Sequence, residues 1–221
     1  MRVFKSFLIV LIAVAVTGCA TTTTMDFSQY HETKPRSILI LPVVNDSLDV
    51  EAPTFVLATL PRVLAEKGYY AFPVNTVKTL LEFEGLYTPA EIHARPTSEL
   101  AELFGAESVL YVVIHSWTSK YLLFATTTEV DFEYTIRDKN GEQLWSARKK
   151  MAYTPQNNNN SGGAFALVAM AVSAALEKAK PSYLPLTRQA NNNVFYIDNT
   201  RIPPGPYSPI YDDYYVKLQG E

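Results

Sequence analysis

The apolar and polar positions along the chain alternate between strand-like and helix-like periods. Residues 37–44 (SILILPVV) form a short apolar run rich in β-branched residues, which predicts a buried strand whose regular pairing ends at Pro42. From about residue 51 to residue 67 the apolar positions recur at helical spacing, and Pro61 is expected to kink or split that helix. The same reasoning predicts a strand at 68–73, helices at 74–83, from 88 and at 97–104, a central strand at 108–117 and a short helix at 185–190. This order predicts an α/β fold, with a mixed β-sheet of about five strands flanked by helices.

A β-hairpin is the most specific local prediction. The dipeptide Asn140-Gly141 is favoured in two-residue type I′ turns, and it lies between two runs with alternating apolar residues. Such a loop pairs Lys139 with Glu142, which sets the register of both strands. The expected inner-face pairs are Ile136–Trp145, Tyr134–Ala147 and Val130–Met151, and the outer-face pairs are Glu133–Arg148 and Asp131–Lys150. Lys149 falls opposite Phe132 on the inner face, so a bulged or solvent-exposed sheet end is expected there.

For two segments near the carboxyl terminus, the sequence allows more than one structural role. Residues 164–176 (AFALVAMAVSAAL) are apolar on nearly all sides but too short to span a bilayer. The alternatives are therefore burial in the fold, an oligomer interface or contact with lipid. Residues 196–221 are rich in proline and tyrosine, and either pack as an extended strap or present a polyproline-like face to a partner. The candidate interface residues are Phe165, Leu167, Val168, Met170, Tyr207 and Tyr211.

The amino terminus has the order of a secretory signal peptide. Arg2 and Lys5 precede a ten-residue apolar run at 7–16, which is about half the length needed to cross a bilayer, and small residues follow it. The only cysteine of the chain stands directly after these small residues. The sequence Val16-Thr17-Gly18-Cys19 resembles the lipobox of bacterial lipoproteins.

That resemblance implies removal of residues 1–18, attachment of diacylglycerol to the Cys19 thiol and acylation of the freed amine. Ala20, in place of the aspartate that retains lipoproteins in the inner membrane, implies an outer-membrane anchor. The lipid bilayer is thus an expected partner, since two or more acyl chains suffice for stable anchoring. Residues 19–34 are polar and threonine-rich without periodicity, so we expect a lipidated tether before a domain at 35–195.

The amino-acid composition and the net charge exclude some classes of function. With 221 residues, 48% of them hydrophobic, the chain can form a packed core. The formal net charge of −3 becomes −5 without the signal peptide, because 17 basic side chains then remain against 22 acidic ones. This balance offers no basic stripe for nucleic acid, which is not an expected partner. A single cysteine cannot form an intramolecular disulfide.

The residues that could act in catalysis or bind a metal form no recognised motif. His31, His93 and His115 are not at metal-ligand spacing, and the sequence has no glycine-rich phosphate loop or nucleophile elbow. We therefore expect no metal, no other cofactor and no enzymatic activity. An envelope hydrolase would need His115 beside an acid and a hydroxyl, which the sequence alone does not place together.

Several short stretches of the sequence resemble those of a known protein family. They are KPRSILILPVVNDS (34–47), GYYAFPV (68–74), GLYTPAEIHARPTSEL (85–100) and FGAESVLYV (104–112), with looser likeness at RQAN (188–191) and PPGPY (203–207). They resemble a family of bacterial lipoproteins of unknown function that includes the neisserial vaccine-candidate lipoprotein. The resemblance implies a fold similar to the TolB amino-terminal domain, a homodimer, and partners among envelope proteins, in the periplasm or at the cell surface. It carries over no active site.

Two hypotheses about function follow. The leading one is a non-enzymatic adaptor or accessory subunit of a cell-envelope transport or secretion assembly. The alternative is a periplasmic module that binds a small apolar ligand or a glycan, with the tyrosine-rich tail as a lid.

Overall fold

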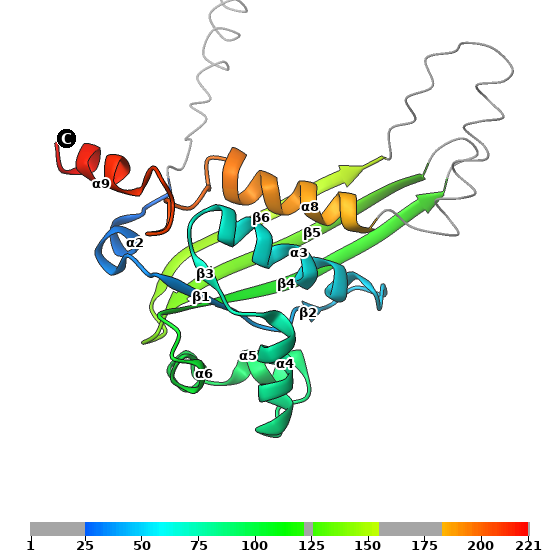
Figure 1. Cartoon of the computed structure of the whole chain (residues 1–221). Coiled ribbons are helices and arrows are strands. Elements are labelled where there is room, and N and C mark those ends of the chain that lie inside the picture. The colour runs from blue at the N-terminus through cyan, green and yellow to red at the C-terminus, as the bar shows by residue number, and fades with distance from the viewer. Residues whose placement is uncertain (1–24, 122–125, 155–182, 221) are drawn as a thin grey trace, which may run out of the picture.

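The computed structural model describes residues 25–121, 126–154 and 183–220 (Figure 1). The signal peptide and the apolar segment 164–176 lie outside these ranges. The predicted site residues that fall outside them are Cys19, Val16, Thr17, Gly18, Phe165, Leu167, Val168 and Met170.

A six-stranded mixed sheet forms the centre of the molecule. Its strands are β1 (Ser37–Ile40), β2 (Val44–Asn45), β3 (Tyr70–Ala71), β4 (Ser108–Tyr121), β5 (Thr126–Asp138) and β6 (Gln143–Tyr153). The order is β3-β1-β4-β5-β6, and β2 also pairs with β4. β1 runs parallel to β3 and β4, whereas β5 runs antiparallel to both of its neighbours, β4 and β6. The predicted α/β class is confirmed.

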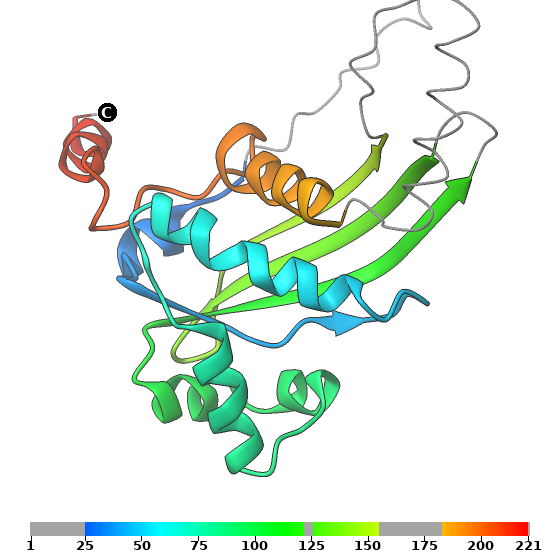
Figure 2. The ribbon, with the colours of Figure 1, turned by 45° about the vertical axis from the view of Figure 1, so that its right-hand side comes forward.

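Helices cover the two faces of the sheet unequally (Figures 1 and 2). On one face α3 (Ala52–Glu66) and α8 (Tyr183–Asn192) lie side by side, and the π-helix η1 (Asn193–Ile197) follows α8. On the other face α4 (Val74–Phe83), α5 (Pro89–Ala94) and α6 (Thr97–Phe104) pack near β1 and the beginning of β4. No described helix covers β5 and β6 on this second face (Figure 2). The helices predicted at 74–83 and 97–104 are confirmed.

Two clusters of buried side chains lie on opposite faces of the sheet. The larger one, between the sheet and α3 and α8, includes Trp145, Tyr134 and Phe195. The smaller one joins the sheet to α4, α5 and α6 and includes Leu81 and Leu100. Because successive strand residues point to opposite faces, β1 contributes to both clusters and is apolar at nearly every position.

The two prolines within the predicted elements behave differently. Pro42 interrupts strand pairing as expected, since β1 ends before it and β2 resumes parallel pairing with β4 at Val44. Pro61, however, lies inside one continuous helix, so the expected split of α3 does not occur. The buried neighbours Leu60 and Leu64 pack both halves of the helix against the core, which compensates for the hydrogen bond that the proline removes.

The register of the predicted hairpin is confirmed, but its turn is different. The pairs from Val130–Met151 to Ile136–Trp145 are those expected. The register shifts beside the turn, where the Asp138 backbone N–H donates to the Glu142 carbonyl and closes a three-residue loop. Asn140 has a negative φ, so the turn is not type I′. The Asp138 carboxylate accepts hydrogen bonds from the backbone N–H groups of Asn140 and Glu142, which stabilises the longer loop.

Lys149 does not mark an exposed or bulged end of the sheet. Its ammonium group lies 2.8 Å from the Asp198 carboxylate, which follows η1, and Phe132 opposite is fully buried. The inner-face lysine is therefore neutralised by a residue from a distant part of the chain. The β4–β5 register instead shifts at His115, between Ile114 and Ser116.

Part of the predicted tether belongs to the folded domain. Residues 28–33 form the helix α2 (Ser28–Thr33), and Tyr30 is fully buried in the larger cluster. Met25 and Phe27 also pack against that cluster. The expectation of a polar tether is therefore wrong for residues 25–33, because their few aromatic and apolar side chains are enough to attach them to the core.

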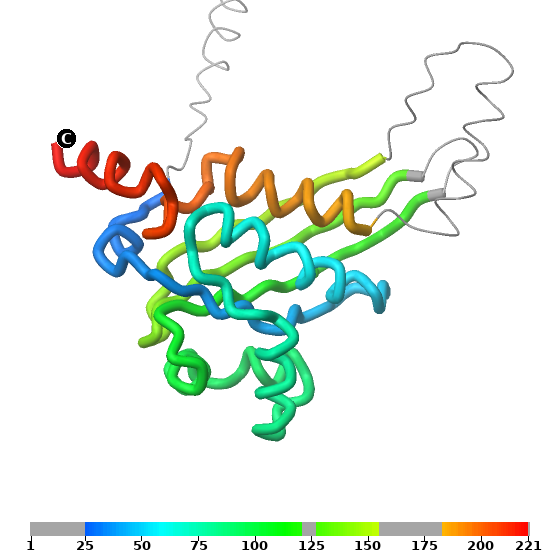
Figure 3. Tube along the Cα trace, in the orientation of Figure 1, coloured from blue at the N-terminus to red at the C-terminus, as the bar shows by residue number. Residues whose placement is uncertain are grey.

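The carboxyl-terminal segment packs as a strap and then becomes helical. The backbone N–H groups of Gly205 and Tyr207 donate to the carbonyls of Lys67 and Gly68, so this stretch is attached to the domain rather than free to act as a lid. Residues beyond it form α9 (Tyr211–Gln219), which corrects the expectation of an extended chain. Figure 3 shows that α9 and α2 lie at the same end of the molecule.

Candidate functional site

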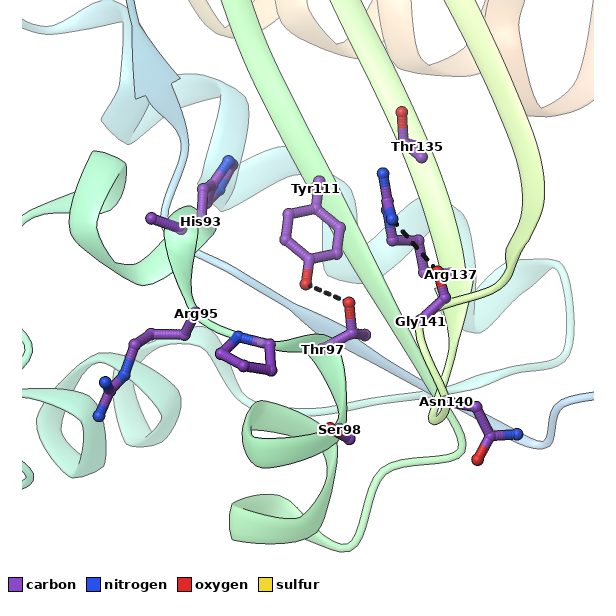
Figure 4. A pocket seen from close by; sticks show the side chains of 11 residues that line it. His93, Arg95, Thr97, Ser98, Tyr111, Thr135, Arg137, Asn140 and Gly141 are labelled. Atoms are coloured by element: carbon purple, nitrogen blue, oxygen red, sulfur yellow. Dashed lines mark hydrogen bonds between the residues drawn. The ribbon is translucent and has the colours of Figure 1, made fainter.

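A cavity of about 510 Å³ opens on the face of the sheet that α3 and α8 leave uncovered (Figure 4). It lies where α5 and α6 meet β4, β5 and the hairpin loop. The side chains that define it are His93, Arg95, Thr97, Ser98, Tyr111 and Arg137. It thus brings together residues from three separate parts of the chain.

Tyr111 occupies the centre of this site and is held from two sides. Its hydroxyl lies 2.9 Å from the Thr97 hydroxyl at the start of α6. The His93 ring packs edge-on against it, with centroids 5.1 Å apart. Burial raises the pKa of Tyr111, so the phenol keeps its proton and remains available as a hydrogen-bond donor.

His93 ties the site to the chain between β1 and β2. Its Nε2 lies 2.9 Å from the carbonyl oxygen of Pro42, which can only accept, so Nε2 carries the proton. Burial lowers the pKa of His93, and the ring is therefore neutral near pH 7. The hydrogen bond also joins α5 to the chain between β1 and β2.

Two arginines give the site a positive charge. The Arg137 guanidinium lies 5.9 Å from the centroid of the Tyr111 ring and donates to the Gly141 carbonyl. Arg95 lies on the other side of Tyr111 in Figure 4, and its guanidinium is 3.5 Å from the Glu99 carboxylate on the outer surface of α6. None of the described residues that line the cavity is acidic. A carboxylate or phosphate group of a ligand therefore matches its charge, because guanidinium groups bind such planar anions with two parallel hydrogen bonds.

Of the interface residues predicted from the sequence, Tyr207 and Tyr211 lie within the described ranges, and neither lines this cavity. Tyr207 is 69% exposed in the strap, and the Tyr211 ring packs 4.7 Å from the Tyr215 ring in α9. Arg95, Tyr111 and Arg137 were not identified from the sequence. Isolated arginines and tyrosines carry no local pattern. The antiparallel pairing of β4 and β5 places Tyr111 near Arg137, and Arg95 joins them because α5 packs against Tyr111 through His93.

His115 does not complete a hydrolytic triad. Its Nε2 lies 2.7 Å from the Glu133 carboxylate and its Nδ1 lies 3.7 Å from the Asp46 carboxylate. Within the described ranges no hydroxyl hydrogen-bonds to the ring, and no group of three or more His, Cys, Asp and Glu side chains could hold a metal ion. None of the described helices is both long and apolar enough to cross a membrane.

Comparison with known proteins identifies relatives over most of the described chain. A family model described as "Putative lipoprotein GNA1162-like" matches residues 25–207. A curated relative, "Putative lipoprotein NMB1124/NMB1162" of Neisseria meningitidis serogroup B, is 36% identical over 149 residues, which cover 67% of this chain and 69% of the relative.

Solved structures add a fold comparison. The crystal structure of lipoprotein GNA1162 from Neisseria meningitidis aligns with a TM-score of 0.52 and 31% identity, covering 67% of this chain and all of that one. The carboxyl-terminal domain of LpoB from Salmonella enterica reaches a TM-score of 0.40 and 19% identity over 53% of this chain and 84% of its own. The helix α9 lies beyond the residues that the family model matches.

Proposed function

The chain belongs to the GNA1162-like lipoprotein family, and from that premise we propose a non-enzymatic adaptor that is anchored in the outer membrane through acylated Cys19. It serves a cell-envelope transport or secretion assembly by binding one of its components. The main support for the proposal is the cavity around Tyr111, where Arg137 forms no ion pair within the described ranges and no described lining residue is acidic. Arg95 adds a second guanidinium, which pairs with Glu99 outside the lining. The partner presents an aspartate, a glutamate or a chain-terminal carboxylate to it.

The cavity suits recognition because its parts are already held in place. Tyr111 is fixed by Thr97 and His93, and Arg137 is held over the aromatic ring by its bond to Gly141. A preorganised site loses little conformational entropy on binding. An exposed charge pair would add modest affinity but strong selectivity for an acidic partner.

In-cell photocrosslinking tests this proposal. We expect benzoylphenylalanine at Ser98, which is exposed on the rim of the cavity, to form adducts with one envelope protein in cells that express the full-length lipoprotein. Arg137→Gln should reduce these adducts, whereas Arg62→Gln, which removes an exposed arginine on α3, should not. Adducts that are insensitive to Arg137→Gln, or recovery of the monomer alone, would contradict the proposal. A copy-to-copy adduct from Tyr207 or Tyr211 would support the homodimer that the resemblance implies.

A periplasmic binding module for a glycan is the second candidate function. The aromatic ring of Tyr111, together with the hydroxyls of Thr97 and Ser98, offers the stacking and hydrogen-bonding groups that a sugar uses. Calorimetry of the full-length protein in detergent with acidic and neutral oligosaccharides separates the two functions. Saturable binding that Arg137→Gln weakens, without any protein adduct in cells, would favour the glycan over the adaptor.

A further inference from the structure

The chain between the lipid anchor and the folded domain is short. Because Met25 and Phe27 pack against the core, the six residues 19–24 are all that precede the first attached residue. Whatever their conformation, they span at most about 20 Å. The end of the domain at which the chain enters therefore lies close to the bilayer, provided that Cys19 carries the anchor of the proposed function.

A second cavity, of about 430 Å³, lies at this same end. Phe27 borders it, and the other side chains that matter are Lys67 after α3, Arg201 after η1, and Ile210 and Tyr214 at α9. In Figures 1 and 2 this end is on the α3 side of the sheet, whereas α5 and α6 lie on the other side. The cavity around Tyr111 is therefore separate from it.

This second cavity holds two cations without a neutralising carboxylate. None of its described lining residues is acidic, and neither Lys67 nor Arg201 forms an ion pair within the described ranges. The nearest acids along the chain are engaged elsewhere, since Glu66 pairs with Arg62 and Asp198 pairs with Lys149.

Lys67 is the more constrained of the two cations. It is half-buried, and its ammonium group lies 4.9 Å from the centroid of the Tyr196 ring. Burial, together with repulsion from Arg201, lowers the pKa of Lys67 to about 8. Two like charges in a partly buried cavity destabilise each other, and a bound anion would reverse that effect.

The rim of the cavity adds the chemistry of a membrane interface. Phe27, Ile210 and Tyr214 surround the cations, and Ile210 is 58% exposed. Aromatic side chains and lysine or arginine are favoured at the boundary between headgroups and acyl chains. We propose that this cavity binds the phosphate of a phospholipid headgroup and so holds the α2 and α9 end of the domain on the bilayer.

Lysine labelling tests the assignment on the full-length, acylated protein in vesicles of phosphatidylethanolamine and phosphatidylglycerol. We expect reductive methylation of Lys67, measured by peptide mass spectrometry, to be slowed by roughly tenfold relative to the protein in detergent, as for a charge-assisted hydrogen bond. Lys78, exposed on α4, is the matched control and should react equally in both. Arg201→Gln should reduce the protection of Lys67 while leaving the protein folded, since Arg201 is exposed.

Three outcomes would overturn the inference. They are equal reactivity of Lys67 in vesicles and detergent, protection that Arg201→Gln leaves unchanged, and equal protection by inorganic phosphate at the same phosphate concentration. The last outcome would indicate a soluble phosphate site. The mass of the amino-terminal peptide tests the anchor separately. If Cys19 is not acylated, the proposed function fails, and the cavity is still tested by adding vesicles to the unacylated protein.

Discussion

Asn191 joins helix α8 both to the sheet and to helix α3. Its side-chain oxygen accepts a 2.7 Å hydrogen bond from the Tyr134 hydroxyl, and its side-chain nitrogen donates to the Thr59 hydroxyl. All three groups are buried. Buried polar groups of this kind are stable only when each one is paired, so the network specifies how the two helices sit on the sheet.

We expect Asn191→Ala to lower the free energy of unfolding by about 2–3 kcal/mol, because it leaves the Tyr134 hydroxyl buried without its acceptor. Urea unfolding of the single variants and of the double variant with Tyr134→Phe measures the coupling. Tyr134→Phe should lower the free energy of unfolding clearly less in the Asn191→Ala background than in the wild type. Additive effects would show that the hydrogen bond does not contribute.

Asp131 is the most heavily paired carboxylate on the open face of the sheet. The Arg148 guanidinium donates two hydrogen bonds of 2.8 Å to it, and the Lys150 ammonium lies 3.4 Å away. The sequence pattern pairs Arg148 with Glu133, which is its direct neighbour in the register, but the ion pair forms along the diagonal. Glu133 bonds instead to His115 on the other neighbouring strand.

Stability should depend on pH through this carboxylate. Hydrogen bonds from Arg148 hold the pKa of Asp131 below its ordinary value of 3.8. A lowered pKa stabilises the fold above the unfolded value, and the contribution is lost progressively as the pH falls from about 5 through that value and below. Because solvent screens the half-exposed Arg148, we expect Asp131→Asn to lower the free energy of unfolding by about 1 kcal/mol at pH 7 and by less at pH 2. Equal costs at both pH values, measured by urea unfolding, would contradict this.

At the scale of elements, the end of α3 and the strap approach each other at two glycines. Gly68 has φ +91°, and a Cβ placed on it would lie 2.7 Å from the Ser208 Cβ and 2.8 Å from the Gly205 carbonyl oxygen. The same contact carries the backbone hydrogen bonds between the strap and residues 67 and 68. The turn after α3 therefore needs glycine both for its conformation and for the close approach of the strap.

Gly85 provides a matched control, since it has φ +81° and a Cβ placed on it would meet nothing within 4 Å. We expect Gly85→Ala to lower the free energy of unfolding by about 1 kcal/mol, which is the strain of a positive φ alone. Gly68→Ala should lower the free energy of unfolding by at least about 2 kcal/mol more than Gly85→Ala does, because it also displaces the strap. Proteolysis of the carboxyl-terminal segment should accelerate in Gly68→Ala only. Similar effects of the two substitutions would mean that the strap is not closely packed.

The hairpin shows how far local pattern can predict an element. The register of β5 and β6 was expected from a two-residue loop, and it holds although the loop has three residues. Apolar alternation accounts for this, since a shift by one residue would turn every side chain to the wrong face. The turn was predicted wrongly because the dipeptide Asn140-Gly141 was weighed without Asp138, whose carboxylate selects the longer loop. The ion pair between Lys149 and Asp198 joins distant parts of the chain, and no local sequence pattern indicates it.

At the scale of the whole molecule, one sheet separates two clusters of buried side chains that share its central strands. Both tryptophans, Trp117 and Trp145, belong to the larger cluster. Leu81 of α4 belongs to the smaller one. Because β1 and β4 contribute side chains to both clusters, neither is expected to unfold without the other.

We expect Leu81→Ala to lower the free energy of unfolding by about 2–5 kcal/mol, and to do so equally by tryptophan fluorescence and by far-ultraviolet circular dichroism. Fluorescence reports only the larger cluster, so coincidence of the two transitions demonstrates cooperativity across the sheet. Phe83→Ala, which truncates an exposed residue of the same helix, should change stability by less than about 0.5 kcal/mol. An unchanged fluorescence transition in Leu81→Ala would mean that the smaller cluster unfolds alone.

The sequence by itself determined the family, the α/β class, most element positions and the register of the hairpin. These depend on the spacing of apolar residues and on short phrases, which are properties of neighbouring positions. Only the tertiary structure decided that residues 25–33 join the core, that Arg95 and Arg137 share a cavity, and that Lys67 and Arg201 lie together near the entry of the chain. Such groupings depend on strand pairing and helix packing between distant segments, which local sequence does not encode.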